Sequence, residues 1–329
     1  MAPSGTIDRV EALLAARRFD EAARLLLAAA GAGETAAVAE LAHWRIVGNL
    51  IRRDLPEARR LLGVAAAKGD DNSAFLHAGF LAGGFGGADD WPGALAALRG
   101  LAKRRPRAAA QLRLIEAMEL DGDGFPARPI ETRRLGETPY VVAAPAFMTE
   151  AECLYLRNEG EPDLQTSAVV DPATGRMVPH PVRSADSAAF GVYAEDLVVN
   201  ALNRRIAALS GTRLDQAEPL QLLRYRPGGE YKPHMDALPA EANQRVLTVL
   251  VYLSDDYEGG ETRFPHTGLS FRGRAGDALM FRNAGADGRP DPLSLHAGQP
   301  VTKGTKYLAS RWIRAARFTF PPPRPILDL

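Results

Sequence analysis

The sequence predicts an α+β protein in two parts, with helical repeats first and a strand-rich domain second. Residues 7–120 are dominated by strong helix formers, with apolar residues three and four positions apart. Two segments within this part repeat, and after residue 211 the apolar pattern changes to a period of two. At 329 residues the chain is long for one domain. Many short strands with no helix between them indicate an antiparallel sandwich or barrel.

The composition restricts the classes of function. The chain is 46% hydrophobic and 24% charged, which is typical of a globular protein with sizeable cores. Lys+Arg and Asp+Glu both number 40, and this balance argues against bulk electrostatic binding of nucleic acid or an anionic membrane. The single cysteine, Cys153, excludes an internal disulfide and suits a reducing compartment. Because no segment is apolar enough for a membrane span, we expect a cytoplasmic protein.

The helical part contains an internal repeat. Trp44, Gly48, Asp54, Ala58 and Leu62 recur 36 residues later as Phe80, Gly84, Asp90, Ala94 and Leu98. A period in this range predicts stacked helix pairs. Over residues 34–107 the pattern resembles Sel1-like repeats, which are relatives of tetratricopeptide repeats. We therefore predict a Sel1-like helical repeat domain over residues 1–120, and two roles stay open for it: structural packing, or a surface that binds a peptide or partner.

A linker and a mixed segment follow the repeats. Residues 121–135 contain Asp-Gly-Asp-Gly and two prolines, which predicts a linker, and the second domain is assigned to residues 136–329. Thr149 is expected to cap a helix, with Glu152 at the capping-box position. Residues 159–189 are polar and rich in Pro and Gly, so they are predicted as a long loop. Helices are expected over 150–158 and 195–209, and strands over 140–142, 220–225, 246–253, 270–272, 278–281 and 307–314.

A possible metal site begins at the triplet His234-Met235-Asp236. In extended backbone, residues two apart project to the same side, so one imidazole and one carboxylate would converge. His296 stands just before a predicted strand. Two histidines and one carboxylate form the facial set that holds iron(II) and leaves the other side of the metal open. Lys306 lies ten residues after His296, and a strand, a turn at Lys303-Gly304 and a return strand would bring its ammonium near the metal. A small dianionic cosubstrate would then span metal and cation.

Each of these residues also has a structural interpretation. His234 and Asp236 would also suit a buried hydrogen-bonded pair, and a lysine on a strand is normally a surface residue with a buried stem. His180, between two prolines, and His266, after Pro265, are competing candidates for a metal ligand.

Four motifs carry a resemblance to a known family. They are Tyr225 to Asp236 (YRPGGEYKPHMD), Gly259 to Phe264 (GGETRF), Gly276 to Phe281 (GDALMF) and Ser294 to Lys306 (SLHAGQPVTKGTK). In order and spacing they resemble the catalytic domain of prolyl 4-hydroxylases, over about residues 140–314. These enzymes are iron(II)- and 2-oxoglutarate-dependent dioxygenases built on a double-stranded β-helix, or jelly-roll, core.

The resemblance implies a role for each motif residue. His234, Asp236 and His296 would be the iron ligands, with no catalytic side chain beyond them. Lys306 would bind the far carboxylate of 2-oxoglutarate, in a pocket lined by Tyr225 and Thr262. The expected substrate contacts are Arg183, Tyr231 and Trp312. The implied cofactors are Fe(II), 2-oxoglutarate and O2, with ascorbate as a further candidate.

The implied activity is that of a procollagen-proline 4-dioxygenase-like enzyme, which hydroxylates a prolyl residue in a peptide or protein and releases succinate and CO2. Three alternatives stay open: a helical-repeat scaffold with an inactive oxygenase domain, an oxygenase that acts on a small metabolite such as a free amino acid, and a nucleic-acid demethylase of the same superfamily. The neutral net charge and a lysine as cosubstrate anchor disfavour the last one. Arg282, Gln299 and Tyr307 depart from the family pattern, which bears on substrate choice more than on chemistry.

Overall fold

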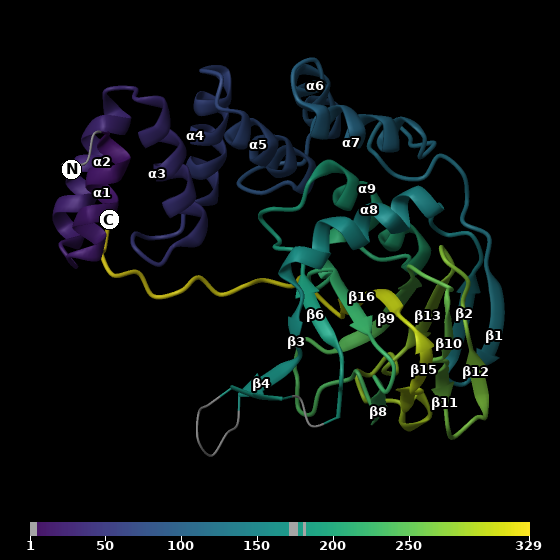
Figure 1. The fold of residues 1–329 in the computed structure, drawn as a ribbon. Coiled ribbons are helices and arrows are strands. Elements are labelled where there is room, and N and C mark those ends of the chain that lie inside the picture. The colour runs from purple at the N-terminus through teal and green to yellow at the C-terminus, as the bar shows by residue number, and fades with distance from the viewer. Residues whose placement is uncertain (1–4, 171–176, 180–181) are drawn as a thin grey trace. The chain divides into compact units, whose positions relative to one another are not determined.

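The structure is a computed structural model of the chain that describes residues 5–170, 177–179 and 182–329. It divides into two compact units (Figure 1). The first comprises residues 1–125, 192–202 and 319–329, and the second comprises residues 126–191 and 203–318. One unit is helical and the other is rich in strands, so the predicted α+β class is confirmed. In the described residues, no helix is both long enough and apolar enough to cross a membrane.

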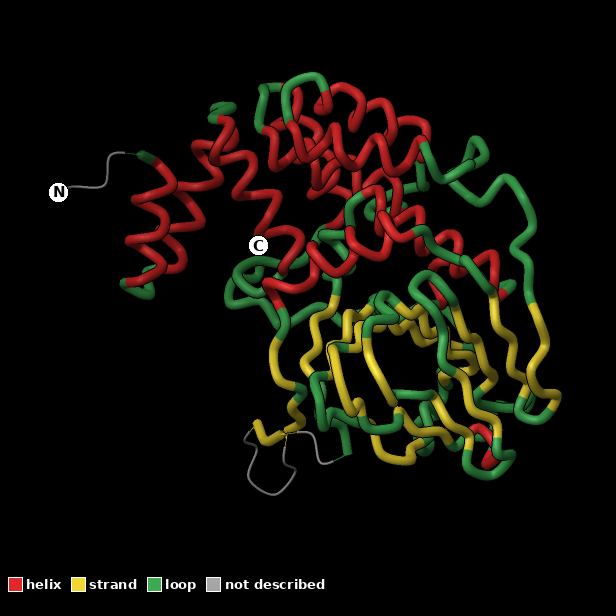
Figure 2. The backbone as a smooth tube through the Cα atoms, turned by 45° about the vertical axis from the view of Figure 1, so that its right-hand side comes forward, coloured by secondary structure: helices red, strands yellow, loops and turns green. Residues whose placement is uncertain are grey.

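The helical unit is a succession of helices in which each packs on the next (Figures 1 and 2). Residues 5–125 contain α1 (Thr6–Ala15), α2 (Phe19–Gly31), α3 (Thr35–Val47), α4 (Leu55–Ala67), α5 (Asp71–Gly83), α6 (Trp91–Ala102) and α7 (Pro106–Glu116).

The 36-residue repeat is confirmed as a repeat of helix pairs, α3–α4 and α5–α6. Gly48 and Gly84 end α3 and α5 with φ of 78° and 66°, the left-handed conformation that a side chain disfavours. Asp54 and Asp90 cap α4 and α6 by accepting from the backbone N–H of the third residue in each helix, at 3.0 and 2.8 Å. The other repeated positions are buried: Trp44, Phe80, Ala58, Ala94, Leu62 and Leu98.

Two segments from later in the chain join the helical unit. The ring of Tyr193 lies 6.3 Å from that of Phe80, and Leu327 packs against the helical core. The backbone N–H groups of Ile326 and Leu327 donate to the carbonyls of Asn49 and Leu50, at 2.9 and 2.8 Å. These segments lie in the range 136–329, which the sequence analysis assigned to the second domain.

The strand-rich unit contains most of the remaining elements. They are β1 (Arg133–Glu137), β2 (Tyr140–Ala144), α8 (Glu150–Gly160), β3 (Gln165–Thr166), β4 (Ala168–Val170), β5 (Met177–Pro179), β6 (Asp186–Ala189), β7 (Gln221–Tyr225), β8 (Tyr231–His234), β9 (Arg245–Tyr252), β10 (Tyr257–Gly259), β11 (Thr262–Phe264), β12 (Leu269–Phe271), β13 (Ala278–Arg282), β14 (His296–Gly298), β15 (Val301–Gly304) and β16 (Lys306–Arg314). Helix α9 (Leu197–Ser210) carries the chain from the first unit into the second.

The strands form a double-stranded β-helix. An eight-stranded antiparallel sheet has the order β1-β2-β13-β9-β16-β7-β6-β3, and a four-stranded sheet has the order β12-β11-β14-β8. From β7 onward the chain passes repeatedly between the two sheets: β7, β9, β13 and β16 lie in the larger one, and β8, β11, β12 and β14 in the smaller. Figure 2 shows these strands curving around one interior. The predicted jelly roll is confirmed.

The loop prediction for residues 159–189 was incomplete. This segment contains β3, β4, β5 and β6, and β6 pairs with β7, where Asp186 lies opposite Arg224. These strands are only two to four residues long, too short to show the alternating apolar pattern that identifies a half-buried strand. Strand β1 begins at Arg133, inside the segment predicted as linker. Its sequence also lacks an alternating apolar pattern, so it was not predicted. The helix cap at Thr149 is confirmed, since Glu152 and Thr149 exchange hydrogen bonds of 2.8 and 3.2 Å.

Candidate functional site

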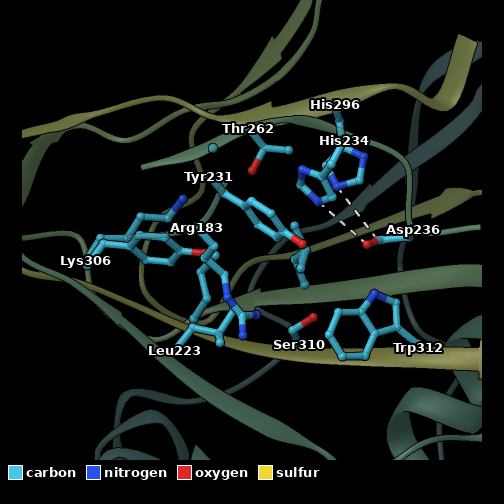
Figure 3. A pocket seen from close by; sticks show the side chains of 14 residues that line it. Arg183, Leu223, Tyr231, His234, Asp236, Thr262, His296, Lys306, Ser310 and Trp312 are labelled. Atoms are coloured by element: carbon cyan, nitrogen blue, oxygen red, sulfur yellow. Dashed lines mark ion pairs between the residues drawn. The ribbon is translucent and has the colours of Figure 1, made fainter. Parts of the chain in front are cut away.

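Two strands of the smaller sheet bring the predicted ligands together. His234 ends β8, His296 begins β14, and the two residues lie opposite each other in the pairing of these strands. Asp236 follows β8 in a bend, so the extended backbone under which the two side chains would converge ends at His234. The donor atoms of the three side chains nevertheless lie within 4.8 Å of one another (Figure 3).

The imidazoles are oriented for coordination. His234 Nδ1 lies 2.8 Å from the carbonyl of Lys232, and His296 Nδ1 lies 3.0 Å from that of Ser294. A carbonyl only accepts, so each Nδ1 carries a proton and each Nε2 keeps its lone pair. The two Nε2 atoms lie 3.6 and 3.7 Å from the two carboxylate oxygens of Asp236. This donor set fits a divalent transition metal of the facial-triad kind.

Burial and neighbouring side chains determine the charges of His296 and Asp236. Burial lowers the pKa of His296 to about 4, so its imidazole is neutral at physiological pH. Burial alone would raise the pKa of Asp236, but interactions with the neighbouring His296 and His234 and the hydrogen bond from the Thr248 hydroxyl outweigh burial and hold the pKa below the usual range. The site therefore presents an ionised carboxylate beside a neutral imidazole.

A buried cation occupies the other end of the same cavity. Lys306, the first residue of β16, is 2% exposed and donates from Nζ to the carbonyl of Gly260 at 2.6 Å. Its ammonium lies 5.4 and 5.3 Å from the ring centres of Tyr225 and Tyr252. Burial lowers the pKa of Lys306 to about 7. It forms no ion pair with the residues that the structure describes, so the site has a buried positive charge open to an anion.

The chain from His296 to Lys306 follows the predicted order of strand, turn and strand, but these strands do not pair with one another. Strand β14 pairs with β8 and β11, β15 pairs with β10, and β16 pairs with β7 and β9. These strands are thus in three sheets and form no hairpin with one another. The turn lies at Gly304, with φ of 74°.

The cavity joins all nine predicted site residues (Figure 3). Tyr225 pairs with Lys306 across β7 and β16, and the hydroxyl of Thr262 lies 2.7 Å from that of Tyr252. The lining comprises Arg183, Leu223, Tyr225, Tyr231, His234, Asp236, Leu250, Thr262, His296, Gly298, Lys306, Leu308, Ser310 and Trp312.

Three of these residues form walls of the cavity around His234, Asp236 and His296. The ring of Tyr231 stacks on that of His234, with a centroid distance of 3.4 Å and an interplanar angle of 14°. The guanidinium of Arg183 lies 5.5 Å from the Tyr231 ring centre. Trp312 is 7% exposed, and the guanidinium of Arg245 lies 4.0 Å from its ring centre. The three expected substrate contacts therefore belong to the same cavity as the ligands.

Other residues singled out by sequence lie elsewhere. His266 is exposed in the turn between β11 and β12, and His180 lies outside the described residues. Arg282 is exposed beside the ring of Tyr140, and the hydroxyl of Tyr307 donates to Glu161 at 2.8 Å. Neither these two side chains nor Gln299 line the cavity.

Sequence reasoning missed two polar residues behind the metal ligands. The hydroxyl of Thr248 donates to Asp236 Oδ2 at 2.6 Å, and Asn283 Nδ2 donates to the Thr248 hydroxyl at 2.8 Å. The signal was faint: one threonine in an otherwise apolar strand, and one asparagine directly after another strand.

Comparison with known proteins identifies relatives of this unit. The sequence model of the 2OG-Fe(II) oxygenase superfamily matches residues 220–314. Prolyl 4-hydroxylase 1 of Arabidopsis thaliana is 38% identical over 197 residues, which cover 54% of this chain and 69% of the relative. Prolyl 4-hydroxylase 5 of the same plant is 34% identical over 231 residues, covering 63% and 78%. Among solved structures, the viral collagen prolyl hydroxylase of Paramecium Bursaria Chlorella virus-1, in its 2OG complex, is 26% identical with a TM-score of 0.45, covering 55% of this chain and 98% of that one.

Proposed function

The chain belongs to the prolyl 4-hydroxylase family of 2OG-Fe(II) oxygenases, and from this premise we propose that it hydroxylates a prolyl residue in a peptide or protein. As a member of the family it is a 2-oxoglutarate-dependent dioxygenase that uses Fe(II), 2-oxoglutarate and O2. The observation that carries the proposal is one cavity with two different ends. A two-histidine, one-carboxylate donor set faces it from one side, and a buried lysine that forms no ion pair with the described residues faces it from the other.

We assign His234, Asp236 and His296 as the iron ligands. Their donor atoms converge, and each imidazole already holds its Nε2 lone pair toward the carboxylate. Bound iron(II) and 2-oxoglutarate would supply the oxidising chemistry, in which one atom of O2 ends in succinate, formed with loss of CO2, and the other in the product hydroxyl. The side chains of the protein would orient the reactants and limit access of water.

We assign Lys306 as the partner of the distant carboxylate of 2-oxoglutarate. An ammonium and a carboxylate attract strongly where both are removed from water. Tyr225 and Thr262 line the same end of the cavity and would position the cosubstrate. The hydrogen bond between Thr262 and Tyr252 fixes where the Thr262 hydroxyl lies.

We assign the opposite end to the substrate, with Arg183, Tyr231 and Trp312 as contacts. Lys306, Leu308, Ser310 and Trp312 alternate along β16 and all line the cavity. At about 3.3 Å per residue, Lys306 and Trp312 are separated by about 20 Å along this strand. That length allows one end to hold the cosubstrate while the other receives a prolyl ring against aromatic walls.

Several finer predictions belong to the same proposal. They are ascorbate as a cofactor, Sel1-like identity of the helical repeats, a cytoplasmic location supported by the single cysteine, and the domain boundaries 1–120, 121–135 and 136–329. The complete set of ligands and the lysine disfavour an inactive scaffold.

The proposal is tested by succinate release from 2-oxoglutarate against a panel of proline-containing peptides, free amino acids and cell lysate. We expect succinate with proline peptides, together with a mass increase of one oxygen atom on a prolyl residue. The His234→Ala variant serves as the inactive control. Product formation with a free amino acid but with no peptide would favour the small-metabolite alternative instead.

A further inference from the structure

The third ligand, Asp236, is held differently from the two histidines. His234 and His296 lie on paired strands of the smaller sheet, and the Nδ1 of each contacts the backbone carbonyl two residues earlier in the chain. Asp236 lies in a bend beyond the end of β8 and takes part in no strand pairing within the described part of the chain. Its position must therefore be determined by side chains from elsewhere.

Those side chains come from the larger sheet. Thr248 lies in β9, and Asn283 is the first residue after β13, which pairs with β9. Both are fully buried, and the backbone of Asn283 is fixed by hydrogen bonds of 2.9 Å to Val246 and from Asp291. The contacts Asn283 Nδ2 to Thr248 Oγ1 (2.8 Å) and Thr248 Oγ1 to Asp236 Oδ2 (2.6 Å) thus connect the larger sheet to a ligand carried by the smaller one.

The direction of this pair of hydrogen bonds follows from its chemistry. Asp236 is ionised and only accepts, so the Thr248 hydroxyl must use its one proton on the carboxylate. Asn283 must then donate through its amide nitrogen, because no proton is left on the hydroxyl. Among the residues that the structure describes, the buried Asn283 Oδ1 has no hydrogen-bond partner, which is costly. This cost is consistent with a role for the Asn283 side chain as the donor to the Thr248 hydroxyl.

We propose that Thr248 and Asn283 are positioning residues that fix the carboxylate of Asp236 for the metal. With Oδ2 engaged by Thr248, Oδ1 is the oxygen left to coordinate, so Asp236 would bind through one oxygen and leave positions open for reactants. The inference rests on the proposed metal centre. Neither residue is among those that line the cavity, so we expect both to act through Asp236.

Metal binding by the full-length protein tests the proposal without turnover. We use Mn(II) as a redox-stable probe and measure free ion by electron paramagnetic resonance. Thr248→Val keeps the shape but removes the hydroxyl, and it is expected to weaken Mn(II) binding about 10- to 100-fold, the usual effect of losing an outer hydrogen-bond partner. Thr248→Ser restores the hydroxyl and should bind within about threefold of wild type, an outcome that separates hydrogen bonding from packing.

Two further variants complete the design. Asn283→Ala should weaken binding in the same direction, because the Thr248 hydroxyl loses its fixed orientation. Ser254→Ala is the matched control: Ser254 is also buried, and its hydroxyl bonds Thr305 and Tyr307 at 3.1 and 2.9 Å, away from the metal ligands. It should lower thermal stability but not Mn(II) affinity. With Co(II), the visible spectrum of Thr248→Val should also change, since the carboxylate is free to rotate.

The outcomes separate the two proposals. Wild-type Mn(II) affinity in folded Thr248→Val and Asn283→Ala would overturn the positioning role. If Thr248→Val does not fold, equal affinities of Asn283→Ala and Ser254→Ala overturn it instead. Equal binding by wild type and His234→Ala would show that the metal centre itself is misassigned.

Discussion

The two ends of the cavity balance charge in opposite ways. At the metal end, the buried carboxylate of Asp236 accepts a hydrogen bond from the Thr248 hydroxyl and lies 3.6 and 3.7 Å from two imidazole nitrogens, so polar side chains of the protein surround its charge. At the other end, Lys306 is buried with a carbonyl and two tyrosine rings, and it lacks an ion pair among the described residues. Burying an unpaired charge is costly, which is why the pKa of Lys306 falls to about 7 while Asp236 stays ionised.

This difference indicates how the two ends respond to their ligands. At the metal end three side chains provide all the protein donor atoms, so replacing one of them should abolish coordination. At the lysine end, a bound anion would supply the opposite charge. Variants of Lys306 should therefore lose affinity for 2-oxoglutarate, and that affinity should depend on pH.

The largest effect is expected at the metal end. His234→Ala or His296→Ala removes one of three protein ligands and should abolish iron(II) binding and turnover. Iron content after anaerobic loading and succinate release measure the two losses, and thermal denaturation checks that the fold survives. His266→Ala, at an exposed histidine outside the cavity, is the control and should behave as wild type. Unchanged iron content in both ligand variants would contradict the assignment.

A large but different effect is expected at the lysine end. Lys306→Ala should weaken 2-oxoglutarate by about 2–5 kcal/mol, the usual cost of removing one partner of a desolvated charge pair. This corresponds to roughly 30-fold or more in the dissociation constant. Metal affinity should stay near that of wild type. Titration calorimetry measures both, and Lys303→Ala, at a lysine 76% exposed, is the matched control. Equal 2-oxoglutarate affinity in Lys306→Ala and Lys303→Ala would refute the role.

The lysine end should also impose a pH dependence on cosubstrate binding. With a pKa of about 7, Lys306 of the free protein is charged below that pH and increasingly neutral above it. The bound dianion requires the ammonium, so binding above pH 7 must take up one proton, and the dissociation constant should rise about tenfold per pH unit. Calorimetry in buffers of different ionisation enthalpy measures the proton uptake. Lys306→Arg stays charged throughout this range and should remove the pH dependence; a flat profile in the wild type would contradict the prediction.

The sequence predicted the ends of the cavity better than the connections between them. His234, Asp236, His296 and Lys306 were identified because they stand in short motifs with characteristic spacing. The route from His296 to Lys306 was not predictable in this way. Strand pairing in a jelly roll alternates between sheets, so neighbours in sequence separate and distant strands meet.

Because distant strands meet in this fold, the sequence also did not reveal the residues that contact the predicted ligands. Thr248 and Asn283 lie far from Asp236 in sequence, and they meet it only because β9 and β13 pair behind the smaller sheet. In the helical unit, by contrast, Gly48 and Asp54 act within their own helix pair, and their recurrence at Gly84 and Asp90 sufficed to predict the arrangement. Local contacts can be read from spacing, whereas contacts between sheets depend on register.

The smallest effect should come from the hydrogen bond behind the cosubstrate end. Tyr252 is fully buried, and its hydroxyl lies 2.7 Å from Thr262 Oγ1, much as Thr248 meets Asp236 at the metal end. Tyr252→Phe removes this neutral contact but leaves the ring. A neutral hydrogen bond contributes about 0.5–1.5 kcal/mol, so 2-oxoglutarate affinity should fall by roughly 2- to 10-fold, with Mn(II) affinity unchanged. Thr248→Val should show the reverse pattern, because its partner is charged and belongs to the metal end. The contrast between the two ends requires that they act independently. If Tyr252→Phe weakens Mn(II) binding as strongly as 2-oxoglutarate binding, the two ends are coupled through the core and this requirement fails.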